Sequence, residues 1–434
     1  MKNLMLIFLL ILFQSCTFSD EDNQGIYSEV TSYLECWDST LQSSGGVGNA
    51  LGISGGDIYL GEGKYNTSGV LYAGSDGDSL YLSKYNSCGN LDWQTLLPNN
   101  VHGGSLRDLN LGSDKNILVL FQITQQFELM KYDSSGSRIW TSTTSHTIDA
   151  MRQMTIDSNN NIYIVGGVGD MNANPSYGEN VGDQSNWSNK DFYIVKYNEN
   201  GVKQWIHQWG SGFTLTSNQN MDSAISVTVD DSNNVYVVGT TNGCPSGLTC
   251  GGGSEDVILL KLDSDGNKLW NKVFGDGSSD SVLRITYHNG YIYFWGATDR
   301  ISGYSWALTK LDTDGNQIWD RGVTVTGYQL VMTSDNRQGG EMIFDSENNI
   351  ILSGTLYNSI NNNSLWISKF DTDGAMLFEK VISSGSNDEL RDISIDSENN
   401  IFITGYTDGD FGTRKNSGTS DMIVMKLNSN GEVQ

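Results

Sequence analysis

The stretch DVILLKLDSDGNKLW at residues 256–270 contains the pattern that decides the fold. An apolar run leads to Lys261, a turn rich in Asp and Gly follows, and Trp270 comes four residues after Gly266. Apolar, β-branched runs favour strands, and clusters of Asp, Asn and Gly favour the tight turns between them. The stretch therefore predicts two antiparallel strands joined by a short hairpin.

The same pattern recurs seven times along the chain. Each copy has a lysine, a bulky residue, Asp or Asn, two further residues and then a glycine. The copies begin at Lys84, Lys131, Lys196, Lys261, Lys310, Lys369 and Lys426. A second apolar strand, such as NIYIVG at 161–166, precedes each copy, and most copies have a further strand before that one. Four short antiparallel strands per unit of about 45–65 residues are typical of a β-propeller blade.

The aromatic residues of the repeat predict how the ring closes. They lie four residues after each glycine in the first six copies, at Trp93, Trp140, Trp205, Trp270, Trp319 and Phe378. The seventh copy stops at Gln434, one residue before that position, whereas Trp37 near the other end of the chain has no copy of its own. We expect the segment around Trp37 to supply the outer strand of the seventh blade, which leaves no open sheet edge. The predicted fold is all-β: a seven-bladed β-propeller over residues 32–434, with four antiparallel strands per blade.

On these motifs the chain resembles the SBBP family of seven-bladed propeller repeats. The resemblance extends over about residues 32–434 and rests on the seven anchors that recur in order. It implies a propeller fold in an exported bacterial protein. It implies no activity, because the motif residues of the family are structural. A weaker likeness to NHL-type repeats implies that the innermost strand of each blade comes first.

The N-terminus predicts an exported lipoprotein. Lys2 is followed by an apolar run at 4–13, which is too short to span a bilayer, and Ser15 precedes Cys16. We interpret residues 1–15 as a signal peptide, Cys16 as the lipidated residue and residues 16–31 as a tether. The expected location is the outer membrane, with the cell surface as a further option. A simple secretory signal that is cut nearby is the alternative.

The formal charge of −26 limits the partners of the protein. An acidic surface repels the phosphates of nucleic acids and does not adsorb to anionic lipid, so we expect no nucleic-acid partner and membrane contact only through the lipid anchor. We also expect a monomer. Export permits disulfides, and Cys244 and Cys250 lie in one loop where a local bridge is predicted. Cys36 and Cys88 are the other available pair, and their spacing leaves the pairing open.

Three Asp-x-Asp-Gly runs have two interpretations. They lie at 263–266, 312–315 and 371–374, and carboxylates at alternate positions before a glycine begin many calcium loops. These runs lack the later bidentate acid of such loops, and they occupy a predicted hairpin, where Asp and Gly are the expected turn formers. We therefore predict structural turns and no cofactor, with calcium as the open alternative.

Four arginines fall at closely matching positions near the start of the predicted first strands: Arg107, Arg152, Arg284 and Arg391. Innermost strands line the channel of a propeller, so these residues predict a partial ring of guanidinium groups at one mouth. Such a ring could hold a carboxylate or a phosphate. In the alternative interpretation, each arginine pairs with an aspartate of a neighbouring blade and fixes a loop.

The long connections of the predicted propeller all lie on one face, for example at 167–190, 208–221, 240–255 and 406–420. Variable loops on a rigid scaffold are where binding sites are built. Trp187, Trp209 and Tyr406 are the candidate ligand-binding aromatics on this face. In the alternative interpretation, these aromatic residues pack their own loops.

Catalytic motifs are absent from the sequence. Its four histidines lie in different predicted blades, and there is no zinc spacing, nucleophile elbow or phosphate loop. We expect a non-catalytic scaffold that binds a protein or a glycan on the long-loop face. An extracellular glycan-active enzyme and a structural part of an envelope assembly are the alternatives. Close carboxylates, one with a raised pKa, would favour the enzyme, and an exposed apolar patch would favour the structural part.

Overall fold

The computed structural model describes the chain from Thr40 to Gln434 with gaps. The described residues are 40–44, 46–54, 57–64, 79–85, 91–97, 104–123, 126–144, 150–168, 191–209, 222–241, 255–275, 279–297, 306–325, 328–330, 340–358, 362–411 and 421–434. None of them belongs to a helix long and apolar enough to cross a membrane. Their regular elements are all β-strands.

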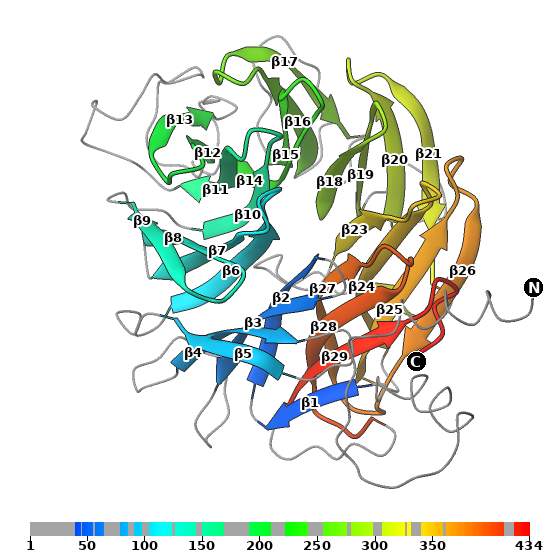
Figure 1. Ribbon diagram of the computed structural model, residues 1–434. Coiled ribbons are helices and arrows are strands. Elements are labelled where there is room, and N and C mark those ends of the chain that lie inside the picture. Colours follow the sequence, from blue (N-terminus) through cyan, green and yellow to red (C-terminus); the bar gives the residue numbers. More distant parts are fainter. Residues whose placement is uncertain are drawn as a thin grey trace, which may run out of the picture.

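The strands pair into seven antiparallel sheets that stand like blades around a centre (Figure 1). Blade 1 contains β2 (Gly46–Ser54), β3 (Asp57–Lys64), β4 (Ser79–Tyr85) and β5 (Leu91–Leu96). Blade 2 contains β6 (Gly104–Leu111), β7 (Ile117–Ile123), β8 (Gln126–Tyr132) and β9 (Arg138–Thr143). Blade 3 contains β10 (Ala150–Ile156), β11 (Ile162–Val168), β12 (Asp191–Tyr197) and β13 (Lys203–Trp209). Blade 4 contains β14 (Asp222–Val229), β15 (Val235–Thr241), β16 (Asp256–Leu262) and β17 (Lys268–Phe274).

The remaining sheets come from the second half of the chain, together with one strand from the beginning. Blade 5 contains β18 (Arg284–His288), β19 (Tyr291–Ala297), β20 (Trp306–Asp312) and β21 (Gln317–Val323). Blade 6 contains β22 (Gln329–Leu330), β23 (Glu341–Phe344), β24 (Ile350–Asn358), β25 (Asn362–Phe370) and β26 (Met376–Ile382). Blade 7 contains β27 (Asp388–Ile395), β28 (Ile401–Thr407), β29 (Asp421–Leu427) and β1 (Thr40–Ser44).

Blade 6 overturns the prediction of seven four-stranded blades. Six of the sheets have four strands, whereas the sheet of blade 6 has five. Its inner strand is divided: β22 and β23 both pair with β24, and residues 331–339 between them lie outside the described residues. The prediction was wrong because the repeat pattern identifies the lysine and glycine anchors of a blade, but it does not detect an insertion into the inner strand.

Both ends of the chain contribute to the outer strand of blade 7. Strand β1 pairs with β29 from Thr40 opposite Met425 to Ser44 opposite Asp421. Val433 forms a bridge with Leu427, and the Gln434 N–H donates to the Lys426 carbonyl at 2.9 Å. An N-terminal strand thus completes blade 7, as expected, with Thr40–Ser44 described and Trp37 outside the described residues. One expectation is corrected: the last copy of the repeat starts its own fourth strand.

The hydrophobic core is divided into layers between neighbouring blades. One cluster joins Leu120 and Phe127 of blade 2 to Tyr193 of blade 3. The layer between blades 5 and 6 contains Trp295 and Trp366, whose ring centroids lie 5.9 Å apart. Each blade thus has both faces covered by the neighbouring blades. This explains why runs such as DFYIVKY in β12 are buried almost throughout.

The repeated motif joins each blade to the next through a set of contacts that we call the outer belt. Lys196 Nζ and Trp205 Nε1 of blade 3 both donate to the Ser264 carbonyl in the turn of blade 4, at 2.8 and 3.2 Å. Gly266 of that turn has φ +88° and lies beneath Trp205 and His207. The equivalent donors in other blades are Trp93, Trp140, Lys131, Lys261, Lys310 and Lys369.

The Asp-x-Asp-Gly runs form the turns of this belt. Asp263 Oδ1 accepts the N–H groups of Asp265 and Asn267, at 3.0 and 2.8 Å, and Asp312 and Asp371 accept in the same way. These hydrogen bonds hold the hairpin in shape and account for the first aspartate of each run. Within the described ranges, no group of three or more His, Cys, Asp or Glu side chains could hold a metal ion.

Candidate functional site: the polar ring of the central channel

The inner strands carry a recurring bulge. In five blades, the pairing between the first and the second strand leaves out one residue of the first strand. These residues are Asn49, Arg107, Arg152, Ile225 and Arg391. A bulge bends the strand and re-aims its side chains. The residue after the bulge, and its equivalents in blades 5 and 6, pair with matching residues of the second strand. We call them the ring positions: Ala50, Asp108, Gln153, Ser226, Arg284, Glu341 and Asp392.

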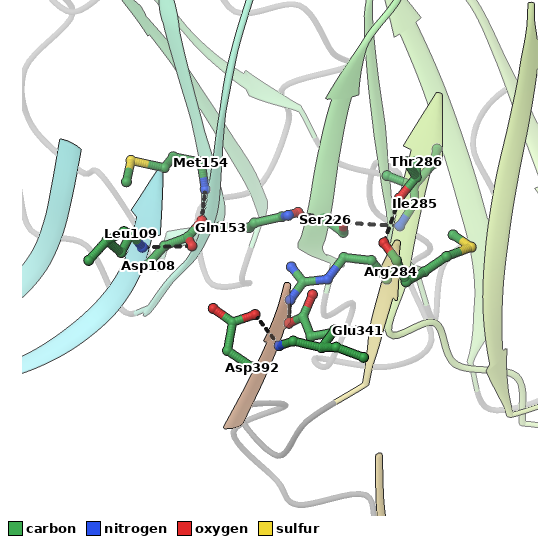
Figure 2. Close-up of polar contacts among 12 residues, drawn as sticks. Asp108, Leu109, Gln153, Met154, Ser226, Arg284, Ile285, Thr286, Glu341 and Asp392 are labelled. Carbon is green, nitrogen blue, oxygen red and sulfur yellow. Dashed lines mark hydrogen bonds and ion pairs between the residues drawn. The ribbon is translucent and has the colours of Figure 1, made fainter. Parts of the chain in front are cut away.

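Three ring positions connect each blade to the next through side chain–backbone hydrogen bonds (Figure 2). Asp108 Oδ2 accepts the Met154 N–H at 2.8 Å. Gln153 Oε1 accepts the Val227 N–H at 2.9 Å. Ser226 Oγ in turn accepts the Ile285 N–H at 3.0 Å. The free edge of an inner strand presents such N–H groups without a ladder partner, so an acceptor from the preceding blade satisfies them.

Arg284 interrupts this series because a guanidinium group has no acceptor. Its side chain forms an ion pair with Glu341 of blade 6, and both side chains are largely buried, with 17% and 15% exposed. In Figure 2 the guanidinium lies beside Glu341 and points to the side of the channel that carries Asp108 of blade 2 and Asp392 of blade 7. Burial lowers the pKa of Arg284, and the two carboxylates oppose this effect. Arg284 therefore links four blades through charge.

Asp108 is the carboxylate with the clearest pKa shift in this group. Burial raises its pKa to about 6, against the opposing effects of the N–H groups of Met154 and Leu109 and of Arg284. The Asp108 side chain is half-buried between the inner strands of blades 2 and 3. A carboxylate in such a site titrates near neutral pH instead of near pH 4.

The contacts of the ring determine what it can do chemically. Asp108 accepts two N–H groups, Asp392 Oδ1 accepts the Ile393 N–H at 2.7 Å, and Glu341 is paired with Arg284. A raised pKa beside other carboxylates is one mark of an acid–base site. These carboxylates, however, already serve as acceptors between or within blades. The arrangement is that of a charged cluster whose members are bonded to the inner strands of the propeller.

The four predicted arginines lie at one level of the channel. Arg107, Arg152 and Arg391 occupy bulges, and Arg284 lies at the next position. Within its own blade, Arg391 Nη2 is 3.4 Å from Glu389 Oε2, and the guanidinium lies 5.3 Å from the ring centroid of Tyr406.

Asp388, which precedes Arg391, bonds to a neighbouring loop instead. Its carboxylate accepts the N–H of Ser384 at 2.7 Å and the hydroxyl of Thr407 at 2.5 Å. Burial raises the pKa of Asp388, and these hydrogen bonds oppose the shift. Here the aspartate fixes the loop without the arginine.

The two described aromatic candidates, Trp209 and Tyr406, lie in strands of different blades. Trp209 lies at the end of β13, is 3% exposed and packs on Phe192 with centroids 5.4 Å apart, so its assignment to an exposed loop is wrong. Tyr406 lies within β28, where Glu389 and burial raise its pKa. The remaining predicted residues lie outside the described residues, namely Trp187, Cys16, Cys244, Cys250, Cys36 and Cys88.

The sequence contains a signal for the ring positions beyond the four arginines. The inner strands of blades 2, 3 and 7 contain LRDL at 106–109, MRQM at 151–154 and LRDI at 390–393. Two successive polar residues between apolar ones break the alternation of a strand, which is the signature of a bulge. The arginine of each motif was the predicted site residue. In blades 2 and 3, however, the residue after the arginine makes the contact with the next blade.

Comparison with known proteins supports this architecture. The SBBP family model, a β-propeller repeat, matches residues 204–244 and 381–412. The chain is a β-propeller repeat protein that is similar to the SBBP family in these two stretches. An uncharacterised WD repeat-containing protein of Acanthamoeba polyphaga mimivirus is 24% identical over 321 residues, which cover 66% of this chain and 21% of that protein. The match thus spans about a fifth of the length of that relative.

Two solved structures resemble this propeller in fold. A puromycin hydrolase has a TM-score of 0.52 at 9% identity, with 89% of this chain and 53% of that chain covered. A puromycin-hydrolyzing peptidase of Mycobacterium tuberculosis has a TM-score of 0.51 at 11% identity, with 89% and 52% covered. At such low identity these matches establish the fold alone.

Proposed function

We propose that the protein is a non-catalytic scaffold that presents a protein or a glycan ligand with a rigid binding face. One observation carries the proposal: the polar side chains that recur or converge in the described blades make contacts within the propeller, between neighbouring strands or blades. The lysines and tryptophans of the outer belt donate to the next blade, and the channel carboxylates accept from neighbouring strands or pair with Arg284.

The face opposite the hairpin turns is the binding face in this proposal. On the turn face, neighbouring turns are tied together, for example by Ser158 Oγ to Asn233 Oδ1 at 3.1 Å and His288 Nε2 to Asn348 Oδ1 at 2.8 Å. The long connections expected from the sequence, such as 169–190 with Trp187, join strands at the other face. A rigid frame with long connections on one side supports binding at that side.

The enzyme alternative rests on the raised pKa of Asp108. A general acid needs a proton that it can deliver to a substrate, at hydrogen-bond distance. Asp108 lies at mid-channel and accepts two backbone N–H groups. This geometry favours a structural carboxylate over an acid catalyst. We place the protein, again as a proposal, at the outer membrane through a lipid on Cys16.

A binding screen with turnover assays in parallel tests the proposed function. Residues 17–434, which include every described element, are screened against a glycan array and against purified envelope proteins. Three variants accompany them: Trp187→Ala on the proposed face, Leu269→Ala on the rim as a matched apolar control, and Asp108→Asn in the channel.

Binding without turnover, weakened at least tenfold in Trp187→Ala and unchanged in Leu269→Ala, is the expected result. Glycan turnover that disappears in Asp108→Asn would refute the scaffold and make the channel an active site. A screen in which neither glycans nor envelope proteins bind would also count against the proposal.

A further inference from the structure

The residues directly before the ring positions differ between the two halves of the propeller. They are the five bulge residues and their equivalents in blades 5 and 6, and in ring order from blade 7 they are Arg391, Asn49, Arg107, Arg152, Ile225, Leu283 and Gly340. The first four belong to blades 7, 1, 2 and 3, whose inner strands β27, β2, β6 and β10 lie side by side (Figure 1). The three arginines of this set, which we call the arginine layer, therefore share one half of the ring.

The arginine layer reaches the solvent of the channel. Arg107, Arg152 and Arg391 are each partly exposed, although they lie within innermost strands whose faces are covered by neighbouring blades. For a residue in that position, the solvent that remains is that of the channel. The first strand of each blade runs from the binding face towards the hairpin turns. The arginine layer therefore lies one residue, or roughly 3 Å, nearer the binding face than the ring positions.

The charge of this layer is positive among the described residues. Glu389, two residues before Arg391, is the described carboxylate beside the layer, and its Oε2 is 3.4 Å from Arg391 Nη2. Three guanidinium groups thus stand against one carboxylate. The aspartates at the starts of three inner strands are at most 1% exposed and do not line the channel: Asp222, Asp280 and Asp388. An anion that enters from the binding face therefore meets guanidinium groups first.

Carboxylates form the next layer of the channel. Asp108 and Asp392 lie one residue deeper than Arg107 and Arg391, and they accept backbone N–H groups. Arg284 lies at the same depth, but Glu341 pairs with it. The channel thus offers cations nearer the binding face and acceptors below them. A second negative charge on a ligand would be repelled by the deeper carboxylates.

We propose that the arginine layer binds the carboxylate of an acidic sugar in a glycan at the binding face. The proposal rests on the proposed function and names its ligand as a glycan that contains uronic acid. Guanidinium groups match the two oxygens of a carboxylate. The hydroxyls that flank the carboxylate of a uronic acid can donate to the deeper carboxylates, because a carboxylate accepts several hydrogen bonds. An acidic peptide would instead bring further carboxylates towards Asp108 and Asp392.

Titration calorimetry with a trimer of galacturonic acid and with the uncharged trimer of galactose tests the proposal. Residues 17–434 are compared with Arg107→Gln, Arg152→Gln and Arg138→Gln. Arg138 is an exposed arginine of β9, so its replacement is a control that removes the same charge from the outer strand of blade 2. The natural chain should bind the acidic trimer at least tenfold more tightly than the neutral one. Arg107→Gln and Arg152→Gln should each weaken that binding at least tenfold, and Arg138→Gln should leave it unchanged.

Three results would overturn the proposal. The first is equal binding of the acidic and the neutral trimer, or no binding of the acidic one, which needs only the natural chain and holds even where a variant does not fold. The second is an equal effect of Arg138→Gln and Arg152→Gln. The third is displacement of the acidic trimer by inorganic phosphate or by a trimer of glutamate at equal concentration, which would assign the layer to another anion.

The proposed function fails by a different result. A screen in which no glycan and no envelope protein binds would refute the scaffold itself. A ligand that depends on Trp187 but binds equally to Arg107→Gln, Arg152→Gln and the natural chain would leave the scaffold intact and refute the arginine layer as its site.

Discussion

The outer belt and the ring positions join the same blades, but the belt uses repeated residues and the ring positions use different ones. In the belt, one set of residues is repeated: a lysine and an aromatic of one blade contact the turn of the next, as Lys196 and Trp205 do at Ser264. In the ring, all seven positions differ except for the aspartates of blades 2 and 7. Repetition at the rim makes blades interchangeable, whereas individual residues at the centre give each blade a specific neighbour.

The comparison shows that the outer strands follow the repeat, whereas the inner strands depart from it. Blade 6 has the regular belt contact of Lys369 with the Ser429 carbonyl, yet its inner strand is divided and its ring position is Glu341. Blade 5 likewise has regular outer strands and an arginine at the ring. The departures from the repeat gather at the channel, so we expect mutations in the belt to act alike in every blade and mutations in the ring to act differently.

The largest loss of stability should come from removal of β1, which closes blade 7 and belongs to neither the outer belt nor the ring positions. Deletion of residues 40–44 removes β1 and leaves β29 as an exposed edge. The five lost ladder residues should lower the free energy of unfolding by about 5 kcal/mol, measured by urea denaturation. Deletion of residues 17–31 is the control and should leave stability unchanged. Equal stability of the two deletions would show that the ring does not depend on β1.

In the belt, Gly266→Ala should be costly. The residue has φ +88°, and a Cβ there would overlap His207 and lie 3.1 Å from Trp205. Strain and overpacking together should cost about 3 kcal/mol. Gly290→Ala is a matched control with φ +82° and no atom within 4 Å of the added Cβ, so it should cost about 1 kcal/mol. Chemical denaturation of both variants measures the difference, and similar losses would mean that packing in the belt contributes little.

In the ring, Gln153→Ala should have an intermediate effect. Gln153 Oε1 accepts the Val227 N–H and the Ser226 hydroxyl, at 2.9 and 2.5 Å, and both donors lie among buried residues. Loss of the acceptor should cost about 2 kcal/mol. Hydrogen exchange should locate the change at β14, because the Val227 N–H loses its partner. Exchange that rises equally in all blades would argue against a blade-specific role of the ring.

The smallest effect should come from the exposed aliphatic residues beside the belt aromatics. Ile139, Leu269, Ile318 and Leu377 are each about half exposed. Leu269→Ser should change the free energy of unfolding by less than about 0.5 kcal/mol, since the side chain buries little area. Trp270→Ala, one residue further on, is the contrast and should cost about 3 kcal/mol. A large loss in Leu269→Ser would reveal packing at the rim that the structure does not contain.

The sequence predicted the blades because the strands and turns of the outer belt follow from patterns of a few adjacent residues. Apolar runs, Asn and Gly turns and the spacing from Lys261 to Trp270 each specify strands or hairpins within a few residues, and the structure confirms them. The candidate site was harder to predict. Arg284 was identified as a channel residue, but its partner Glu341 and the opposing Asp108 and Asp392 were not, because they belong to other blades.

The sequence by itself determined an all-β propeller, a repeated hairpin that joins blade to blade, and closure of the ring by the two chain ends. These features follow from short-range patterns, since the turn chemistry and strand alternation of each copy are complete within that copy. Only the tertiary structure decided that Thr40–Ser44 pair with β29, that blade 6 has a divided inner strand, and that Arg284 interacts with three carboxylates. Charges separated by more than a hundred residues interact only because ring closure brings their strands to one channel.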